Sequence, residues 1–245
     1  MGTCPQAEES SWNRIQVGLC QTYHADGSFK HNKACLITQG FNQHPGFEYL
    51  DIFTPTMHLS TLCIVLALAV IYDLYLLSVD ISYAYLNGEI NCKVYMEQPE
   101  GFVEGDPQEL VCLLQKAHYG TKQGGNRWNH KMCTVLESMG FSQTYSDAAV
   151  YVYVKGDICL ILPVFVNDMT FAFQSLKAIK DTIQQLQKHF KVHNPDPTRE
   201  ILGIKIDRDR SKHSLTILLY RYAQLLHHDR LQACHHSHGS WFSSL

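Results

Sequence analysis

Charged residues are scarce in this sequence, and neither sign dominates. Asp, Glu, Lys and Arg make up 18% of the 245 residues, and the formal net charge at pH 7 is −3. Soluble domains usually contain about 25% charged residues. Without a global positive charge, any affinity for nucleic acid must come from a local basic patch. Apolar residues make up 45% of the chain, which excludes a disordered polypeptide and predicts a globular protein with a sizeable core.

The sequence also lacks paired cysteines, a membrane span and a secretion leader. Its nine cysteines are odd in number and have no C-x-x-C spacing, which indicates reduced thiols in an intracellular protein of the cytoplasm or nucleus. The longest apolar run, at 62–72, is interrupted by Asp73 and is too short to cross a bilayer, so no membrane partner is expected. The histidines at 235–238 do not have the spacing of a common zinc site.

Hydrophobic periodicity predicts alternating strands and helices in the first half of the chain. Residues 1–30 show no clear period, and 35–41 alternate weakly as a strand does. Ser60 is placed to cap a helix that carries the 62–72 run. A short apolar strand follows at 74–81 and ends near Asp80, and another short strand is expected at 93–102.

The second half of the chain continues this alternation. An amphipathic helix is predicted at 124–140, with a glycine at its end. Two apolar strands flank a tight connection at 155–157, and a helix stripe covers 176–190. A second hairpin is expected around the charged turn at 207–213. Together these elements predict an α+β or α/β domain.

Polar residues end two of the expected buried strands. Asp80 closes one strand, and Asn167 and Asp168 close another, in the stretch VFVNDM. Phosphoryl transfer by two divalent cations needs carboxylates that converge from separate elements, with few further protein ligands. The alternative is that these residues are ordinary strand ends without a catalytic role, because strands often end on Asp simply to enter a turn.

Several segments resemble, in their amino-acid sequence and in their order, motifs of the reverse transcriptase domain of copia-type LTR retrotransposon polyproteins. The resemblance runs from about residue 30 to 230. The segments that carry it, in chain order, are KACLITQGF (33–41), FTPTMHLSTLCIVLALA (53–69), VDISYAYLNG (79–88), YMEQPEGF (95–102), YGTKQGGNRW (119–128), FVND (165–168) and ILGI (201–204).

The resemblance implies an α+β right-hand polymerase, with fingers, a palm built on a ferredoxin-like sheet and the start of a thumb. It implies a segment without clear structure at 1–30, fingers and palm at 31–233, and an unrelated or disordered tail at 234–245. The implied activity is RNA-directed DNA synthesis with two Mg²⁺ ions, or Mn²⁺ in their place. The implied partners are an RNA or DNA template–primer and dNTPs.

Individual site residues follow from the same resemblance. Asp80 matches the first catalytic carboxylate, so Asp80 and Asp168 are the expected metal ligands. Tyr85 matches the aromatic residue that lies under the sugar and excludes a 2′-OH; the alternative is a core tyrosine. Gln123 and Lys33 match the nucleotide pocket, although Gln123 could equally be a solvated loop amide.

A local basic and aromatic patch lies at the start of the helix expected at 124–140. It could contact template phosphates and bases, or it could be an ordinary solvated helix face. Its members are Lys122, Arg127, Trp128 and Lys131.

The sequence differs from the family pattern at positions that the resemblance assigns to the chemistry. Asn167 replaces the first Asp of the paired carboxylates, and a neutral amide cannot offset cation charge. Cys35 stands in place of a fingers arginine, and Gln39 and Ser82 stand in place of lysines. Pro163 lies in the strand before the motif, where it removes a ladder donor. These departures predict a degenerate, truncated copy with weak or no activity; the alternative is a palm remnant that binds nucleic acid without catalysis.

Overall fold

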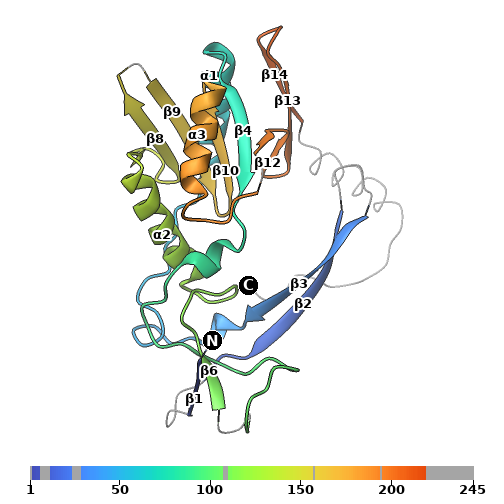
Figure 1. The fold of residues 1–245 in the computed structure, drawn as a ribbon, viewed down its shortest axis with the longest axis vertical. Helices are drawn as coiled ribbons and strands as arrows, with labels where there is room; N and C mark the ends of the chain where they lie inside the picture. The colour runs from blue at the N-terminus through green and yellow to red at the C-terminus, as the bar shows by residue number, and fades with distance from the viewer. Residues whose placement is uncertain are drawn as a thin grey trace, which may run out of the picture.

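A six-stranded antiparallel sheet forms the centre of the protein in the computed structural model, which describes residues 2–5, 12–23, 29–106, 110–156, 158–193 and 195–218. Its strand order is β11-β4-β10-β9-β8-β7 (Figure 1). The strands are β4 (Tyr75–Asp80), β7 (Ser142–Gln143), β8 (Val150–Lys155), β9 (Ile158–Phe165), β10 (Asp168–Phe173) and β11 (Asp196–Pro197). The tail expected at 234–245 lies outside the described residues.

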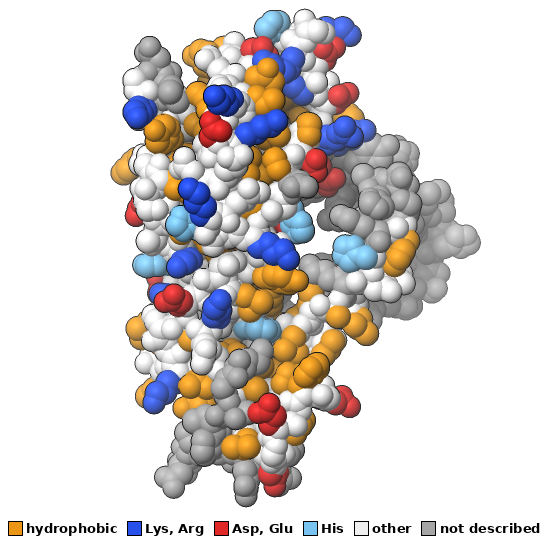
Figure 2. Space-filling view, viewed as in Figure 1, with side chains coloured by type: hydrophobic (Ala, Val, Ile, Leu, Met, Phe, Trp, Pro, Cys, Tyr) orange, Lys and Arg blue, Asp and Glu red, His pale blue; other side chains and the backbone are white. Residues whose placement is uncertain are grey.

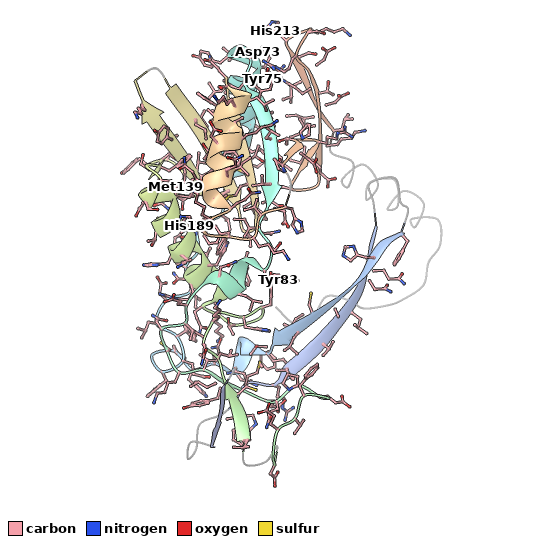
Figure 3. The ribbon with its side chains drawn as sticks, viewed as in Figure 1. Asp73, Tyr75, Tyr83, Met139, His189 and His213 are labelled. Carbon is pink, nitrogen blue, oxygen red and sulfur yellow. The ribbon has the colours of Figure 1, made fainter. Side chains whose placement is uncertain are left out.

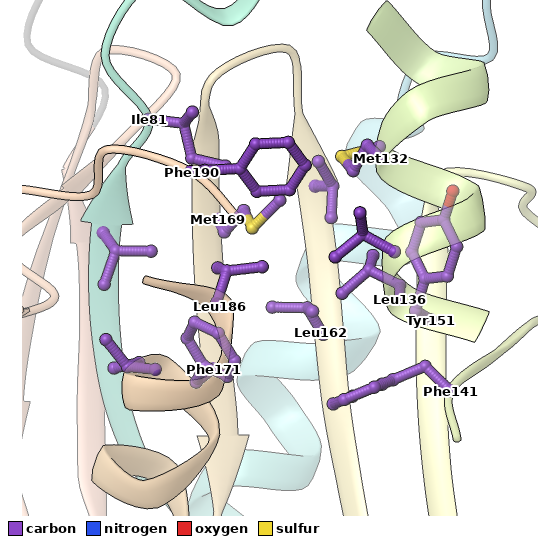
Figure 4. Packing of buried hydrophobic residues seen from close by; sticks show 14 of the residues in the cluster. Ile81, Met132, Leu136, Phe141, Tyr151, Leu162, Met169, Phe171, Leu186 and Phe190 are labelled. Atoms are coloured by element: carbon purple, nitrogen blue, oxygen red, sulfur yellow. The ribbon is translucent and has the colours of Figure 1, made fainter. Parts of the chain in front are cut away.

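Two helices cover one face of this sheet. Alternate side chains of β4 and β10, such as Val79 and Phe171, point toward α2 (Gly124–Ser138) and α3 (Leu176–Leu186). Apolar residues recur three and four apart on both helices, so each presents one apolar stripe to the sheet. Figure 4 shows the result as a continuous layer of buried side chains between the strands and the two helices.

The intervening side chains of the sheet point to the opposite face, which is also covered. Leu76 and Ala172 pack with α1 (Leu59–Ile71) and with a three-stranded sheet of β12 (Glu200–Ile201), β13 (Ile204–Asp209) and β14 (Ser214–Leu218). An ion pair and a stacking contact secure the β13–β14 hairpin, because Arg210 binds Asp73 at 2.6 Å and lies 3.7 Å from the Tyr75 ring centroid. Figure 3 labels Asp73 and Tyr75, which lie at the same end of the molecule. The central sheet is therefore the middle of three layers.

Two smaller sheets lie beyond this core. β2 (Ile15–Tyr23) and β3 (Phe29–Thr38) form a long ribbon that extends away from the core (Figure 1). β1 (Gly2–Pro5), β6 (Leu110–Leu113) and β5 (Tyr95–Met96) form the other. Two short 3-10 helices, η1 (Gly40–Asn42) and η2 (Ala84–Asn87), connect these parts. The first thirty residues, without a clear period, thus contribute β1 and β2.

The predicted mixed α/β architecture is present, with helices and hairpins close to their predicted positions. Two local predictions were wrong. Ser60 does not cap α1, because the helix begins at Leu59 and the His58 backbone N–H is instead bound by the distant Asp147 carboxylate at 3.0 Å. The strand expected at 93–102 is reduced to Tyr95–Met96. Among the described residues, no helix is long and apolar enough to span a membrane.

Candidate functional site: a carboxylate pair closed by an amide

Asp80 and Asp168 lie directly opposite each other on neighbouring antiparallel strands. β4 ends at Asp80, β10 begins at Asp168, and the register pairs the two residues. Directly opposed residues project to the same face, with Cβ atoms about 5 Å apart. Asp80 has the same alternation as Leu76, which packs against the α1 layer. The two carboxylates are therefore on the face of the sheet away from α2 and α3.

The turn before Asp168 has two residues, Val166 and Asn167. Val166 has φ 54, a left-handed conformation that is unfavourable for a β-branched side chain. Two hydrogen bonds hold this conformation: the Trp128 indole N–H donates to the Val166 carbonyl at 2.7 Å, and the Ile81 N–H donates to the Asn167 carbonyl at 2.9 Å. Strained residues persist where the surrounding structure determines them in this way.

Both oxygens of the Asp80 carboxylate lie near nitrogen atoms of the protein. The Asn167 side-chain amide donates a hydrogen bond to Asp80 Oδ1. Asp80 Oδ2 lies 3.5 Å from Nε2 of His193. The pKa of Asp168 is raised, because its carboxyl loses hydration and because Asp80 carries the same charge nearby. The Asn167 hydrogen bond thus links the turn before β10 to β4. A carboxylate at this position would need a cation to make the same link.

The donor set does not fit two Mg²⁺ ions. A pair of ions needs several anionic oxygens in common, and Asn167 presents its NH₂ group, which is a donor and not a ligand, to Asp80. In the part of the chain that the structure describes, no three His, Cys, Asp or Glu side chains are already grouped to hold a metal ion. Asp80 and Asp168 remain suited to a single cation.

Tyr85 and Gln123 differ in their surroundings. Tyr85 lies half-buried on η2, stacked on Tyr119 with ring centroids 4.8 Å apart. Gln123 is only 1% exposed; its amide donates to the Glu48 carbonyl and its Oε1 accepts from Gln43. Gln123 was expected in the nucleotide pocket, but in this structure its side chain is enclosed by protein.

The expected basic patch is divided. Trp128 is 1% exposed and packs edge-on against Phe190, so it has no face free for base stacking. Arg127 and Lys131 lie one turn apart on α2, the layer opposite the carboxylates, and Arg127 donates to the Glu89 carbonyl at 2.7 Å. The remaining member, Lys122, is exposed, with its ammonium 5.2 Å from the Tyr49 ring centroid. Lys33, which was expected at the nucleotide pocket, lies on β3.

A close backbone approach explains the glycine that follows η2, Gly88. A Cβ atom at Gly88 would lie 2.7 Å from the Arg127 carbonyl carbon and 2.8 Å from the Trp128 nitrogen. Only glycine allows η2 to sit against the first turn of α2 in this way. Because Trp128 in turn binds Val166, this contact positions the strand-end turn relative to Tyr85.

The other departures have distinct positions. Cys35 is half-buried on β3, and the Gln39 N–H donates to the Arg14 carbonyl. Pro163 lies in β9, whose pairing with β10 is recorded on both sides of it, at Met169↔Val164 and Ala172↔Ile161. The ladder therefore resumes beyond the proline.

His193 was not identified from the sequence. The Ile81↔Val192 bridge, with the His193 N–H donating to the Asp80 carbonyl at 2.9 Å, places His193 directly opposite Asp80. Its Nε2 is also 3.1 Å from Ser82 Oγ, across 111 residues of chain. No local pattern indicates such a pairing, because it depends on strand register.

A protein-family model described as reverse transcriptase (RNA-dependent DNA polymerase) matches residues 19–236. The chain belongs to this family. The order of its motifs and the opposed Asp80 and Asp168 agree with that assignment.

The relatives place the chain in the copia-type branch of the family. It is 33% identical over 186 residues to the retrovirus-related Pol polyprotein from transposon RE2 of Arabidopsis thaliana, covering 76% of this chain and 13% of that protein. It is 33% identical over 193 residues to the polyprotein from transposon TNT 1-94 of Nicotiana tabacum, covering 78% and 14%. The yeast Ty1-LR3 Gag-Pol polyprotein is 30% identical over 196 residues, covering 74% and 10%.

The chain therefore spans only a small part of the length of these polyproteins. Among solved structures, apo telomerase from Candida tropicalis, truncated from its C-terminal domain, aligns with a TM-score of 0.44 and 8% identity. That alignment covers 88% of this chain and 57% of the telomerase chain.

Proposed function

We propose that this chain is the fingers and palm part of a reverse transcriptase domain that still engages template–primer but has lost most or all nucleotidyl transfer. The central sheet with α2 and α3 would be the palm, the β2–β3 ribbon would belong to the fingers, and the β12–β14 sheet would precede the thumb. Family membership supports the polymerase assignment, and the state of the carboxylate site supports the loss of activity.

The observation that carries this proposal is the hydrogen bond from Asn167 to Asp80. Cations in polymerase-type sites stabilise both the attacking and the leaving oxygen during phosphoryl transfer. An amide that donates to Asp80 competes with a cation for this carboxylate and adds no negative charge. Loss of one preorganised electrostatic group costs about 10²–10³ in rate, and loss of a metal carboxylate is expected to cost at least that much.

Primer extension on the purified chain tests the proposal. With Mg²⁺, extension of a labelled primer on an RNA or DNA template is expected to be at or near background. Asn167→Asp is expected to raise extension at least tenfold, because it restores an anionic ligand beside Asp80. Asn42→Asp, an exposed substitution on η1, is the matched control and should change nothing. Robust extension by the unsubstituted chain would contradict the proposed loss of activity.

A second candidate function is nucleic-acid binding by the face that α2 and α3 form, without any catalysis. The charge on that helical face favours it. Figure 2 shows lysine and arginine side chains spread down the face that α2 and α3 form. On and after α3, Lys177, Lys180, Lys188 and Lys191 are all exposed, and α2 adds Arg127 and Lys131. Phosphate contacts of this kind release counterions and give salt-dependent affinity.

Charge reversal distinguishes duplex binding over the helical face from duplex binding over the face that carries Asp80 and Asp168. If duplex lies over the helical face, Lys188→Glu should weaken template–primer binding several-fold and reduce the slope of log affinity against log salt by about one unit. If duplex lies over the carboxylate face, this substitution should have little effect. Lys155→Glu, at the exposed end of β8, is the charge-matched control. Fluorescence anisotropy between 50 and 200 mM salt measures both quantities.

A further inference from the structure

His193 lies opposite Asp80, on the segment that pairs with β4 on the side away from β10. Asp168 is opposite Asp80 on one side, and the 191–193 segment pairs with β4 on the other. The backbone bonds from His193 N–H to Asp80 and from Ser82 N–H to Lys191 fix this register. Directly opposed side chains share a face, so the His193 imidazole and both carboxylates project to the same side of the sheet.

The spacing between His193 and Asp80 matches that of two ligands on one cation. Nε2 and Oδ2 are 3.5 Å apart. Metal–ligand bonds of about 2.0–2.2 Å, meeting at angles between a right angle and a tetrahedral angle, place ligand atoms about 3.0–3.5 Å apart. Ser82 Oγ is 3.1 Å from the same nitrogen, and because a ring nitrogen has a single bonding position in the ring plane, a bound cation takes the place of this hydrogen bond. The His193 side chain is 65% exposed, which leaves the nitrogen accessible to an ion from solvent.

The chemistry of these ligands selects among cations. Mg²⁺ favours an octahedral shell of oxygen atoms, whereas an imidazole nitrogen suits first-row transition metals. The loss of a carboxylate at Asn167 reduces the oxygen set, while His193 adds a nitrogen. Both changes act against Mg²⁺.

We propose that His193 and Asp80 form the core of a site for a single first-row transition-metal cation, for which Mn²⁺ serves as a paramagnetic probe. Asp168 is placed on the same face to supply a further oxygen, and water completes the shell. The cation replaces the Asn167 hydrogen bond to Asp80 when it binds. The inference rests on the proposed function only in taking Asp80 as a metal-binding carboxylate, because cation binding needs neither nucleic acid nor catalysis.

Mn²⁺ binding to the full chain, followed by electron paramagnetic resonance, tests this site. Mn²⁺ is the suitable probe because hard oxygen ligands suit it and thiolates, which nine cysteines could supply, select softer metals. We expect one bound Mn²⁺, displaced by Mg²⁺ only in large excess. Pulsed measurements should detect coupling to a coordinated ¹⁴N nucleus.

Three variants assign the signal. His193→Ala should weaken Mn²⁺ binding at least fivefold and remove the ¹⁴N coupling, with Mg²⁺ affinity unchanged. His189→Ala removes another exposed imidazole, four residues earlier (Figure 3), and should behave as the unsubstituted chain does. Asp80→Asn should abolish binding at this site. Unchanged Mn²⁺ affinity in His193→Ala, or ¹⁴N coupling that survives in Asp80→Asn, would overturn the proposal.

These outcomes are independent of those for the proposed function. If the chain fails to bind template–primer but binds Mn²⁺ through His193, the proposed function fails and the cation site stands. If template–primer binds while Mn²⁺ affinity does not depend on His193, the reverse holds.

Discussion

Replacing Trp128 with alanine is expected to destabilise the protein by about 3–5 kcal/mol, the usual cost of removing a buried aromatic side chain. Trp128 is 1% exposed and packs among the side chains of the α2, α3 and sheet layer. The substitution also leaves the Val166 carbonyl without its indole donor. That turn carries Asn167, so the site should be disturbed together with the core.

Trp128→Phe separates the two effects. It keeps most of the packing against Phe190 but removes the hydrogen bond, so we expect a loss of about 1–3 kcal/mol. Trp12→Ala, at a residue 38% exposed, is the control and should cost less than either. Urea denaturation followed by circular dichroism measures the free energy of unfolding of each variant. A loss below about 1 kcal/mol for Trp128→Ala would contradict the structural role of the indole.

Asn167→Asp is expected to make the stability of the protein depend on divalent cation. The substitution removes the hydrogen bond to Asp80 and adds a third carboxylate beside Asp80 and Asp168, whose pKa is already raised by its surroundings. Without cation, we expect a loss of roughly 1–2 kcal/mol, kept small by the exposure of the site to solvent. In a chain of this size this corresponds to a fall in Tm of about 2–8 °C.

Cation should reverse this loss in the variant. A ligand at ten times its Kd contributes about 1.4 kcal/mol to the folded state, so millimolar Mg²⁺ should restore most of the Tm of Asn167→Asp. The unsubstituted chain should respond little to Mg²⁺, because the Asn167 amide already links β4 to the strand-end turn. Thermal denaturation with EDTA and with Mg²⁺ measures the difference. Equal Mg²⁺ responses in the two proteins would contradict the role assigned to Asn167.

The helices and hairpins could be predicted because their signals are local. Apolar residues three and four apart on α2 and α3 report a helix with one buried face, and the 155–157 connection reports a hairpin. The cap at Ser60 failed for the opposite reason. The amide of His58 finds its acceptor in Asp147, 89 residues away, and a tertiary contact of this kind overrides a local preference.

Burial of polar and aromatic side chains could not be predicted. Gln123 and Trp128 stand in the sequence beside Lys122 and Arg127. Trp128 was predicted as part of a surface patch, and Gln123 as part of a nucleotide pocket or as a solvated loop amide. In the structure they are enclosed, because a 3-10 helix, the α2 N-terminus and the 43–48 segment meet there. Sequence neighbours on a helix point in different directions, and only the packing of other elements decides which directions reach solvent.

By itself, the sequence determined the order of motifs, the family to which they belong, and the two strands that end on Asp80 and at Asn167-Asp168. It also determined that an amide stands where a carboxylate is expected. Tertiary structure alone decided that this amide donates to Asp80 and that His193 lies on the other side of the same carboxylate. The physical reason is strand register, which brings together residues far apart in the chain and which no local pattern encodes.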